Sequence, residues 1–257
     1  MKHKTLYIGY GFSALSLIVF RVCQVAFTIE SNTGFYKPQY ENLWLVSAAV
    51  IIISVAAITL FSFSDIDFNC REKEGRGVAA LTVVVGIAFL IKAFATFSQN
   101  AGLMALLLTL LAILSAGVCF VNAYSVFCGK SVSVGSYALI VPFWIIELVF
   151  TFIQNNDVSS VPHRFYEIIT VALCLVFSLN IAKDKAGMLT QISSKIMVSL
   201  SLAASLFCLA LSVPDVVLFL AGKGNLLHDA SVLDLLYLAY GVYIPTYIFT
   251  TFKLKKV

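Results

Sequence analysis

Eight apolar stretches, each about as long as a helix that crosses a bilayer, alternate with short polar connections along this chain. A membrane-spanning helix takes about 20 mainly apolar residues. Hydrophobic residues make up 60% of the chain and charged residues 12%, whereas soluble proteins carry about 25% charged residues. We therefore predict an all-α integral membrane protein with eight transmembrane helices, at residues 5–29, 43–64, 77–98, 102–127, 134–154, 161–182, 196–220 and 231–252.

The connections between these stretches leave no room for a soluble domain, so residues 1–257 are predicted to form a single polytopic membrane domain. The first stretch resembles a signal peptide, but it is long, contains Arg21 and lacks a small-residue cleavage pattern. We interpret it as a retained first helix. The eight helices then make four helical hairpins.

The distribution of basic residues predicts the orientation of these hairpins, because short loops that carry Lys and Arg stay on the cytoplasmic side. With the N-terminus and the C-terminus both cytoplasmic, twelve basic residues lie inside and three outside. The inner set is Lys2, Lys4, Arg71, Lys73, Arg76, Lys130, Lys183, Lys185, Lys195, Lys253, Lys255 and Lys256; the outer set is Lys37, Arg164 and Lys223. This asymmetry predicts the cytoplasmic (plasma) membrane as the location, and it explains the basic balance by attraction to anionic lipid rather than to nucleic acid.

Four ionisable residues interrupt the predicted helices. Arg21, Lys92, Glu147 and Asp215 each lie in an odd-numbered stretch, in the half of the helix that faces the outer side. An ionised group at the bilayer centre costs about 2.5 to 3.5 kcal/mol on insertion scales, so such groups need partners, water or a function. We expect two cations and two anions to form one polar layer, with Arg21 paired to Glu147 or Asp215 and Lys92 to the other acid.

Uncharged polar residues follow the same helix faces, because residues three, four and seven apart stack along one side of a helix. Gln24 shares a face with Arg21, Thr96 and Gln99 share one with Lys92, and Thr151 and Gln154 share one with Glu147. These five residues are predicted to line the charged layer with hydrogen-bonding groups.

Residues 77–127 and 134–182 resemble each other at a constant offset of 55. The offset pairs Lys92, Thr96, Phe97, Gln99 and Asn100 with Glu147, Thr151, Phe152, Gln154 and Asn155, and it pairs Cys119 with Cys174. Internal repeats are common in transporters, where the site lies at the repeat interface. Duplication of a helical hairpin is one explanation, and chance similarity among apolar residues is the other.

The tyrosines of the last stretch, the inner connections, and the cysteines and histidines do not by themselves indicate a site. Tyr237, Tyr240, Tyr243 and Tyr247 share one face of the last stretch, as packed aromatic residues or as a wall against a ligand. The inner segment 65–76 is most simply a solvated turn, although short charged loops also dock partners. Asp184 is assigned to the inner side, in the connection after the stretch 161–182. No disulfide framework, metal site or cofactor site is indicated by the scattered cysteines and loop histidines.

The sequence contains no HExxH, GxSxG or P-loop pattern, so we expect no enzyme. The favoured function is a small permease-like or solute- or ion-binding protein that uses the charged layer for a small solute or a proton. The alternative is a noncatalytic membrane subunit, scaffold or sensor, in which the layer is a structural ion-pair network or meets a membrane protein partner.

Overall fold

The computed structural model describes residues 5–28, 37–40, 46, 49–56, 59, 66–71, 75–99, 102–130, 134–154, 162–222 and 235–254. Its α-helices are α1 Thr5–Cys23, α3 Arg76–Gln99, α4 Leu103–Phe127, α5 Val134–Ala138, α6 Val141–Gln154, α7 Pro162–Lys185, α8 Gln191–Leu220 and α9 Leu235–Thr251. A π-helical turn, Gln24–Thr28, continues α1, and Pro38–Tyr40 form a 3₁₀ turn. Two short strands, β1 Ile66–Arg71 and β2 Phe252–Leu254, complete the described elements.

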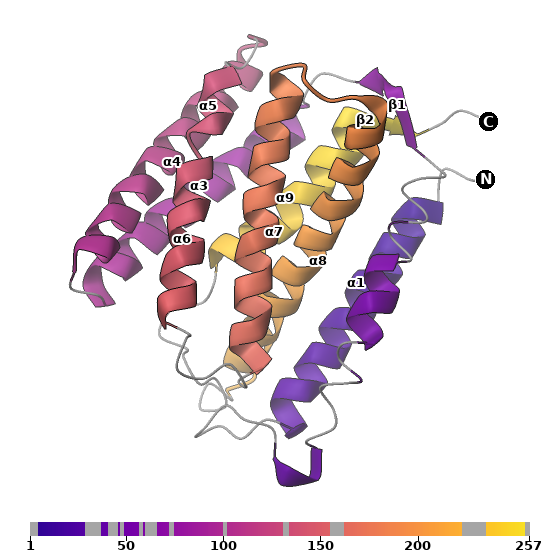
Figure 1. Cartoon of the computed structure of the whole chain (residues 1–257), viewed down its shortest axis with the longest axis vertical. Helices are drawn as coiled ribbons and strands as arrows, with labels where there is room; N and C mark the ends of the chain where they lie inside the picture. The colour runs from indigo at the N-terminus through magenta and orange to yellow at the C-terminus, as the bar shows by residue number, and fades with distance from the viewer. Residues whose placement is uncertain are drawn as a thin grey trace.

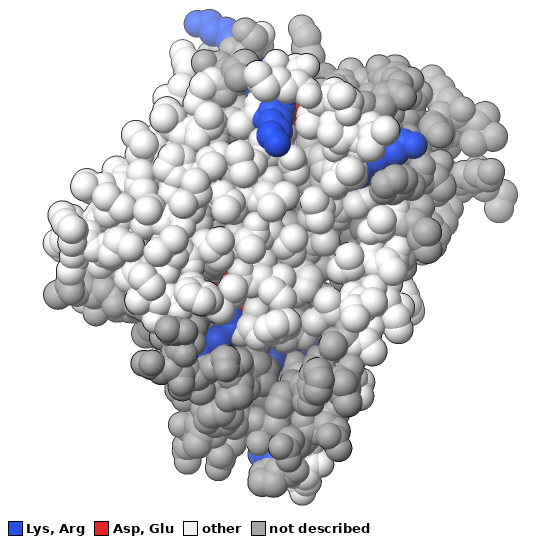
Figure 2. Space-filling view, viewed as in Figure 1, with Lys and Arg blue, Asp and Glu red and all other residues white. Residues whose placement is uncertain are grey.

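Six of the described helical segments are long and apolar enough to cross a membrane. They lie side by side (Figure 1). Large apolar side chains such as Phe94 are exposed, and the described residues on one face form a broad, mainly uncharged belt with Lys and Arg side chains above and below it (Figure 2). This is the surface expected of helices that face lipid. The prediction of a helical membrane protein is thus confirmed at the level of its architecture.

The predicted helix boundaries need three corrections. The stretch 134–154 is broken into α5 and α6, because Pro142 has no backbone N–H to continue the helical hydrogen bonds of α5. Helix α8 begins at Gln191, where the Thr190 side chain accepts a hydrogen bond from Ser193 N and caps the helix. Helix α9 ends at Thr251, so Phe252 belongs to a strand.

The predicted stretches 43–64 and 231–252 are not among these six described segments. Of the stretch 43–64, residues 49–56 are helical, and the ends of this stretch lie outside the described residues. Helix α9 has 17 residues, which corresponds to about 25 Å at 1.5 Å per residue. It packs between α3 and α8 in the bundle interior.

Contacts between neighbouring helices close into a ring in the order α3, α4, α6, α7, α8 and α9. Helix α1 packs on the outside of this ring, against α8. Aromatic side chains fill the interior: Phe89 of α3 contacts Phe143 and Trp144 of α6, and Trp144 contacts Tyr240 of α9 with ring centroids 5.0 Å apart. The tyrosine face of α9 therefore lies in the packed core.

Strands β1 and β2 correct the prediction that residues 65–76 form only a solvated turn. They pair antiparallel, with Ile66 opposite Leu254 and Arg71 opposite Phe252. Figure 1 places this pair at the same end of the bundle as the start of α1. The pairing ties the connection before α3 to the segment after α9.

Candidate functional site

The four predicted charged residues fall into two sets of contacts. Lys92 and Glu147 meet inside the helix ring, from α3 and α6. Arg21, on α1, contacts Tyr166 of α7. It is also close enough to Asp215 on α8 for an electrostatic interaction between the two charges. The opposite charges are thus brought together in two places, Lys92 with Glu147 and Arg21 near Asp215.

The Lys92–Glu147 pair has an asymmetric environment. Lys92 Nζ lies 2.9 Å from Glu147 Oε1, and the exposed fractions of the two side chains are 22% and 2%. Within the described residues, Glu147 Oε2 is buried and has no hydrogen-bond partner. The carboxylate is therefore enclosed, and only one of its two oxygens is used by the lysine.

The packing of α3 against α6 explains why these two side chains meet. Phe89 lies one turn before Lys92, and Trp144 lies one turn before Glu147, so each aromatic shares a face with the charge that follows it. Contact between Phe89 and Trp144, with centroids 6.3 Å apart, turns both faces toward each other. The ring of Tyr237 closes the site from α9, with its centroid 5.9 Å from Lys92 Nζ.

The Arg21 set lies where the α-helix α1 changes to a π-helix. Arg21 is 1% exposed, donates a hydrogen bond to Gln24 Oε1, and stacks its guanidinium 4.2 Å from the centroid of the Tyr166 ring. The Thr28 hydroxyl donates a hydrogen bond to the backbone carbonyl oxygen of Gln24 at 2.6 Å. Such π-helical insertions are frequent at functional sites, and here the insertion lies beside a cation held by an amide and an aromatic ring.

The hydrogen-bonding residues predicted beside the charges are partly described. Gln24, Thr96 and Thr151 are buried, as their shared faces with Arg21, Lys92 and Glu147 predicted. Gln99 and Gln154 are the last residues of α3 and α6, and their side chains lie outside the described part of the chain.

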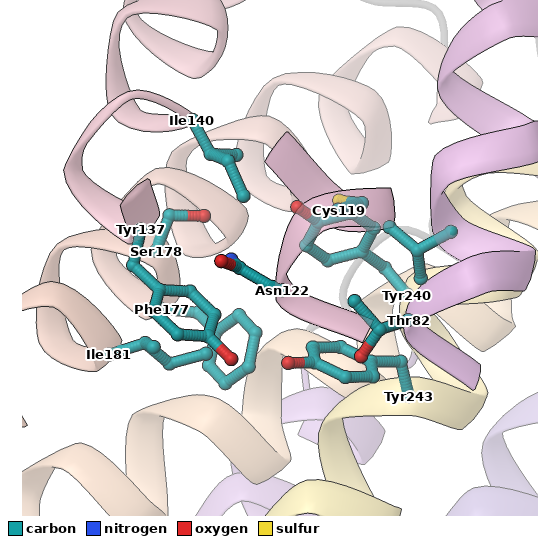
Figure 3. Close-up of a pocket in the computed structure, with 11 residues that line it drawn as sticks. Thr82, Cys119, Asn122, Tyr137, Ile140, Phe177, Ser178, Ile181, Tyr240 and Tyr243 are labelled. Atoms are coloured by element: carbon teal, nitrogen blue, oxygen red, sulfur yellow. The ribbon is translucent and has the colours of Figure 1, made fainter. Parts of the chain in front are cut away.

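A second polar site was missed by the sequence analysis. A cavity of about 20 Å³ lies among α3, α4, α5, α7 and α9, and its polar lining includes Thr82, Asn122, Tyr137, Ser178, Tyr240 and Tyr243. Figure 3 shows the Asn122 amide and the tyrosine hydroxyls turned toward one common space. The sequence signal was a single amide inside the apolar stretch 102–127, which carries no charge and so did not stand out.

Asp184 also occupies a place that the sequence did not predict. It was expected in the inner connection after the stretch 161–182, but α7 extends to Lys185 and buries Asp184 against α9. The Tyr247 hydroxyl donates to Asp184 Oδ2 at 3.3 Å. A buried carboxylate therefore lies at the opposite end of the α9 tyrosine face from Glu147.

Comparisons with protein-family models, with curated proteins and with solved structures each found no match for this chain.

Proposed function

We propose that this chain is a small permease-like protein that binds and moves a small solute or ion at the Lys92–Glu147 pair. The observation that carries the proposal is the second oxygen of Glu147, which is buried without a hydrogen-bond partner among the described residues. A buried acceptor left unsatisfied costs about 1–3 kcal/mol, and more when it is charged. A proton or a small hydrogen-bond donor at this oxygen would remove that cost.

The position of the pair also supports a transport site. Ionisable residues inside membrane bundles commonly mark ion pathways and proton relays. Glu147 lies on a helix that begins at a break beside Pro142, and interrupted helices are a common element of transporter binding sites. The site thus combines an enclosed carboxylate with irregular backbone two turns away.

We propose further that α3–α4 and α5–α7 are copies of one hairpin. Residues at the offset of 55 meet each other in the structure: Lys92 pairs with Glu147, and Phe89 contacts Trp144. The cavity is lined by three more such pairs, Thr82 with Tyr137, Val85 with Ile140, and Asn122 with Phe177. Contact between equivalent residues is what two hairpins related by a pseudo-two-fold axis produce, and transporter sites lie at such interfaces.

In the proposed topology, eight helices cross the cytoplasmic (plasma) membrane and both termini lie in the cytoplasm. The end of the bundle that carries β1 and β2 is then the cytoplasmic end, because β1 belongs to a predicted inner segment and the inner side is assigned twelve basic residues against three on the outer side.

A noncatalytic membrane subunit or scaffold is the second candidate. It is favoured by the direct contact between Lys92 and Glu147, since an ion pair between two helices also serves to fix their register. In that case the pair would have no ligand, and its removal would affect folding alone.

Purified protein in liposomes distinguishes the two candidates. An imposed pH gradient is followed with an enclosed pH-sensitive dye, for the wild type, Glu147→Gln and empty liposomes. Glutamine keeps the shape and one acceptor for Lys92, so we expect folded protein whose proton flux falls to that of empty liposomes. Asp157→Asn, which removes a carboxylate from a predicted outer loop, serves as the control and should keep the wild-type flux.

Two outcomes would count against the proposal. A wild type with no more proton flux than empty liposomes would exclude the proton as the transported ion. Loss of folded protein in each single charge reversal, with recovery in Lys92→Glu combined with Glu147→Lys, would instead establish the structural ion pair.

A further inference from the structure

The cavity beside Asn122 has the properties of a site for one small polar molecule. Asn122 is 1% exposed, and its Oδ1 accepts a hydrogen bond from the Ser136 hydroxyl at 2.6 Å. Its Nδ2 is buried and has no hydrogen-bond partner among the described residues. An amide nitrogen in this state has two unused N–H donors at the wall of a cavity.

The volume of the cavity matches a water molecule. About 10–15 Å³ is enough to hold one water that has polar partners, and the cavity has about 20 Å³. Hydroxyl oxygens, which can accept hydrogen bonds, also line the cavity, from Tyr240, Tyr243 and Ser178 (Figure 3). The hydroxyl of Tyr240 already accepts a hydrogen bond from Trp144 Nε1 at 3.3 Å, which leaves its own proton to donate.

The cavity lies midway along a line of hydroxyls on α9. Tyr237, beside Lys92, and Tyr247, bonded to Asp184, are ten residues apart, about 15 Å along a helix. Between them, the rings of Tyr240 and Tyr243 have centroids 6.2 Å apart. Both tyrosines line the cavity, so a molecule bound there can contact both hydroxyls.

We infer that the cavity binds one water molecule, held by Asn122, and that this water links the two halves of a polar route along α9 between Glu147 and Asp184. The inference rests on the proposed function and adds to it that the ion moved is a proton. In each step of such a relay an oxygen accepts one proton and releases another, so one O–H bond forms for each that breaks. The net result is one proton removed from the Asp184 end and one gained by the Glu147 carboxylate.

Bound water inside a membrane protein can be detected by radiolytic hydroxyl labelling, in which water generates radicals that modify the side chains touching it. We expect Tyr243 and Phe177, at the cavity, to be labelled several-fold faster than Tyr166 and Phe143, which are buried residues of the same types outside the cavity. Equal labelling of each matched pair would overturn the water site.

Two substitutions test the role of Asn122 and of the hydroxyl line. Asn122→Leu fills the cavity and removes the donor, so labelling of Phe177 should fall to that of Phe143. Tyr243→Phe keeps the shape and removes one hydroxyl, and is the test if Asn122→Leu does not fold. Ser201→Ala, at a buried serine of α8 outside the cavity, is the control and should leave labelling unchanged. Unchanged labelling in both cavity variants would overturn the inference.

The same variants in the liposome assay separate this inference from the proposed function. A proton flux abolished by Glu147→Gln and lowered several-fold by Tyr243→Phe supports both. Flux abolished by Glu147→Gln but unchanged in Asn122→Leu and Tyr243→Phe would overturn the route and leave the proposed site. Absence of proton flux from the wild type would overturn the proton route, whereas recovery of folded protein only in the double charge reversal of Lys92 and Glu147 would overturn the proposed transport site.

Discussion

Removal of Lys92 should destabilise the protein more than removal of the Glu147 charge, because the two partners differ in burial. Lys92→Met leaves a carboxylate that is 2% exposed without its cation, and stranding one member of a buried pair costs about 3–5 kcal/mol. Glu147→Gln leaves an ammonium that is 22% exposed on a flexible stem that can reach more polar surroundings. The main loss there is one charge-assisted hydrogen bond, about 1.5–3 kcal/mol.

The measurement is a double-mutant cycle on the free energy of unfolding in mixed micelles, titrated with a denaturing detergent. Since the two groups are in direct contact, Lys92→Met combined with Glu147→Gln should cost less than the sum of the single changes, by about 0.5–3 kcal/mol. Lys130→Met, at an exposed lysine after α4, is the control and should lie within about 0.5 kcal/mol of the wild type. Equal costs for the two single changes, or strict additivity, would refute this account of the pair.

Two further predictions concern packing and topology. Gly241→Ala should destabilise the protein by about 1–3 kcal/mol, because its Cβ would lie 2.9 Å from Leu209 Cγ in the close contact of α8 with α9. Gly117→Ala, with no atom within 4 Å of the new Cβ, should be neutral or stabilising, and both are measured by the same detergent titration. Cys128, exposed at the end of α4, should react with an impermeant maleimide only after the cells are permeabilised, whereas buried Cys119 should stay unlabelled. Labelling of Cys128 in intact cells would reverse the proposed orientation.

The parts of the fold that depend on length and periodicity could be predicted from the sequence. The stretches 77–98 and 102–127 match α3 and α4 within one residue at each end, because polar residues mark where an apolar helix leaves the membrane. The stripe of Arg21 and Gln24 was also predicted, since a polar face must turn away from lipid. These features are local, and each follows from residues within one helix.

Features that depend on contact between distant segments could not be predicted in the same way. Residues 66–71 look like a charged connection until they pair with 252–254, which lie at the other end of the sequence. Likewise, Asp184 looks solvated until Tyr247 donates a hydrogen bond to it from another helix. In both cases the partner, rather than the local composition, determines the environment.

Asn122 shows why a polar site without charge is the hardest to predict in a membrane protein. Its amide adds little to the average hydropathy of a 25-residue apolar helix, so the stretch is interpreted as uniform. In the folded bundle the same amide is enclosed by α3, α5, α7 and α9, where one unpaired N–H costs about as much as a lost hydrogen bond. A charge in such a stretch is noticed because an ionised group is costly to insert into the bilayer. An amide is less costly than a charge, so its need for a partner becomes visible only in the folded bundle, where no described group accepts a hydrogen bond from Nδ2 and a molecule small enough to enter the cavity can do so.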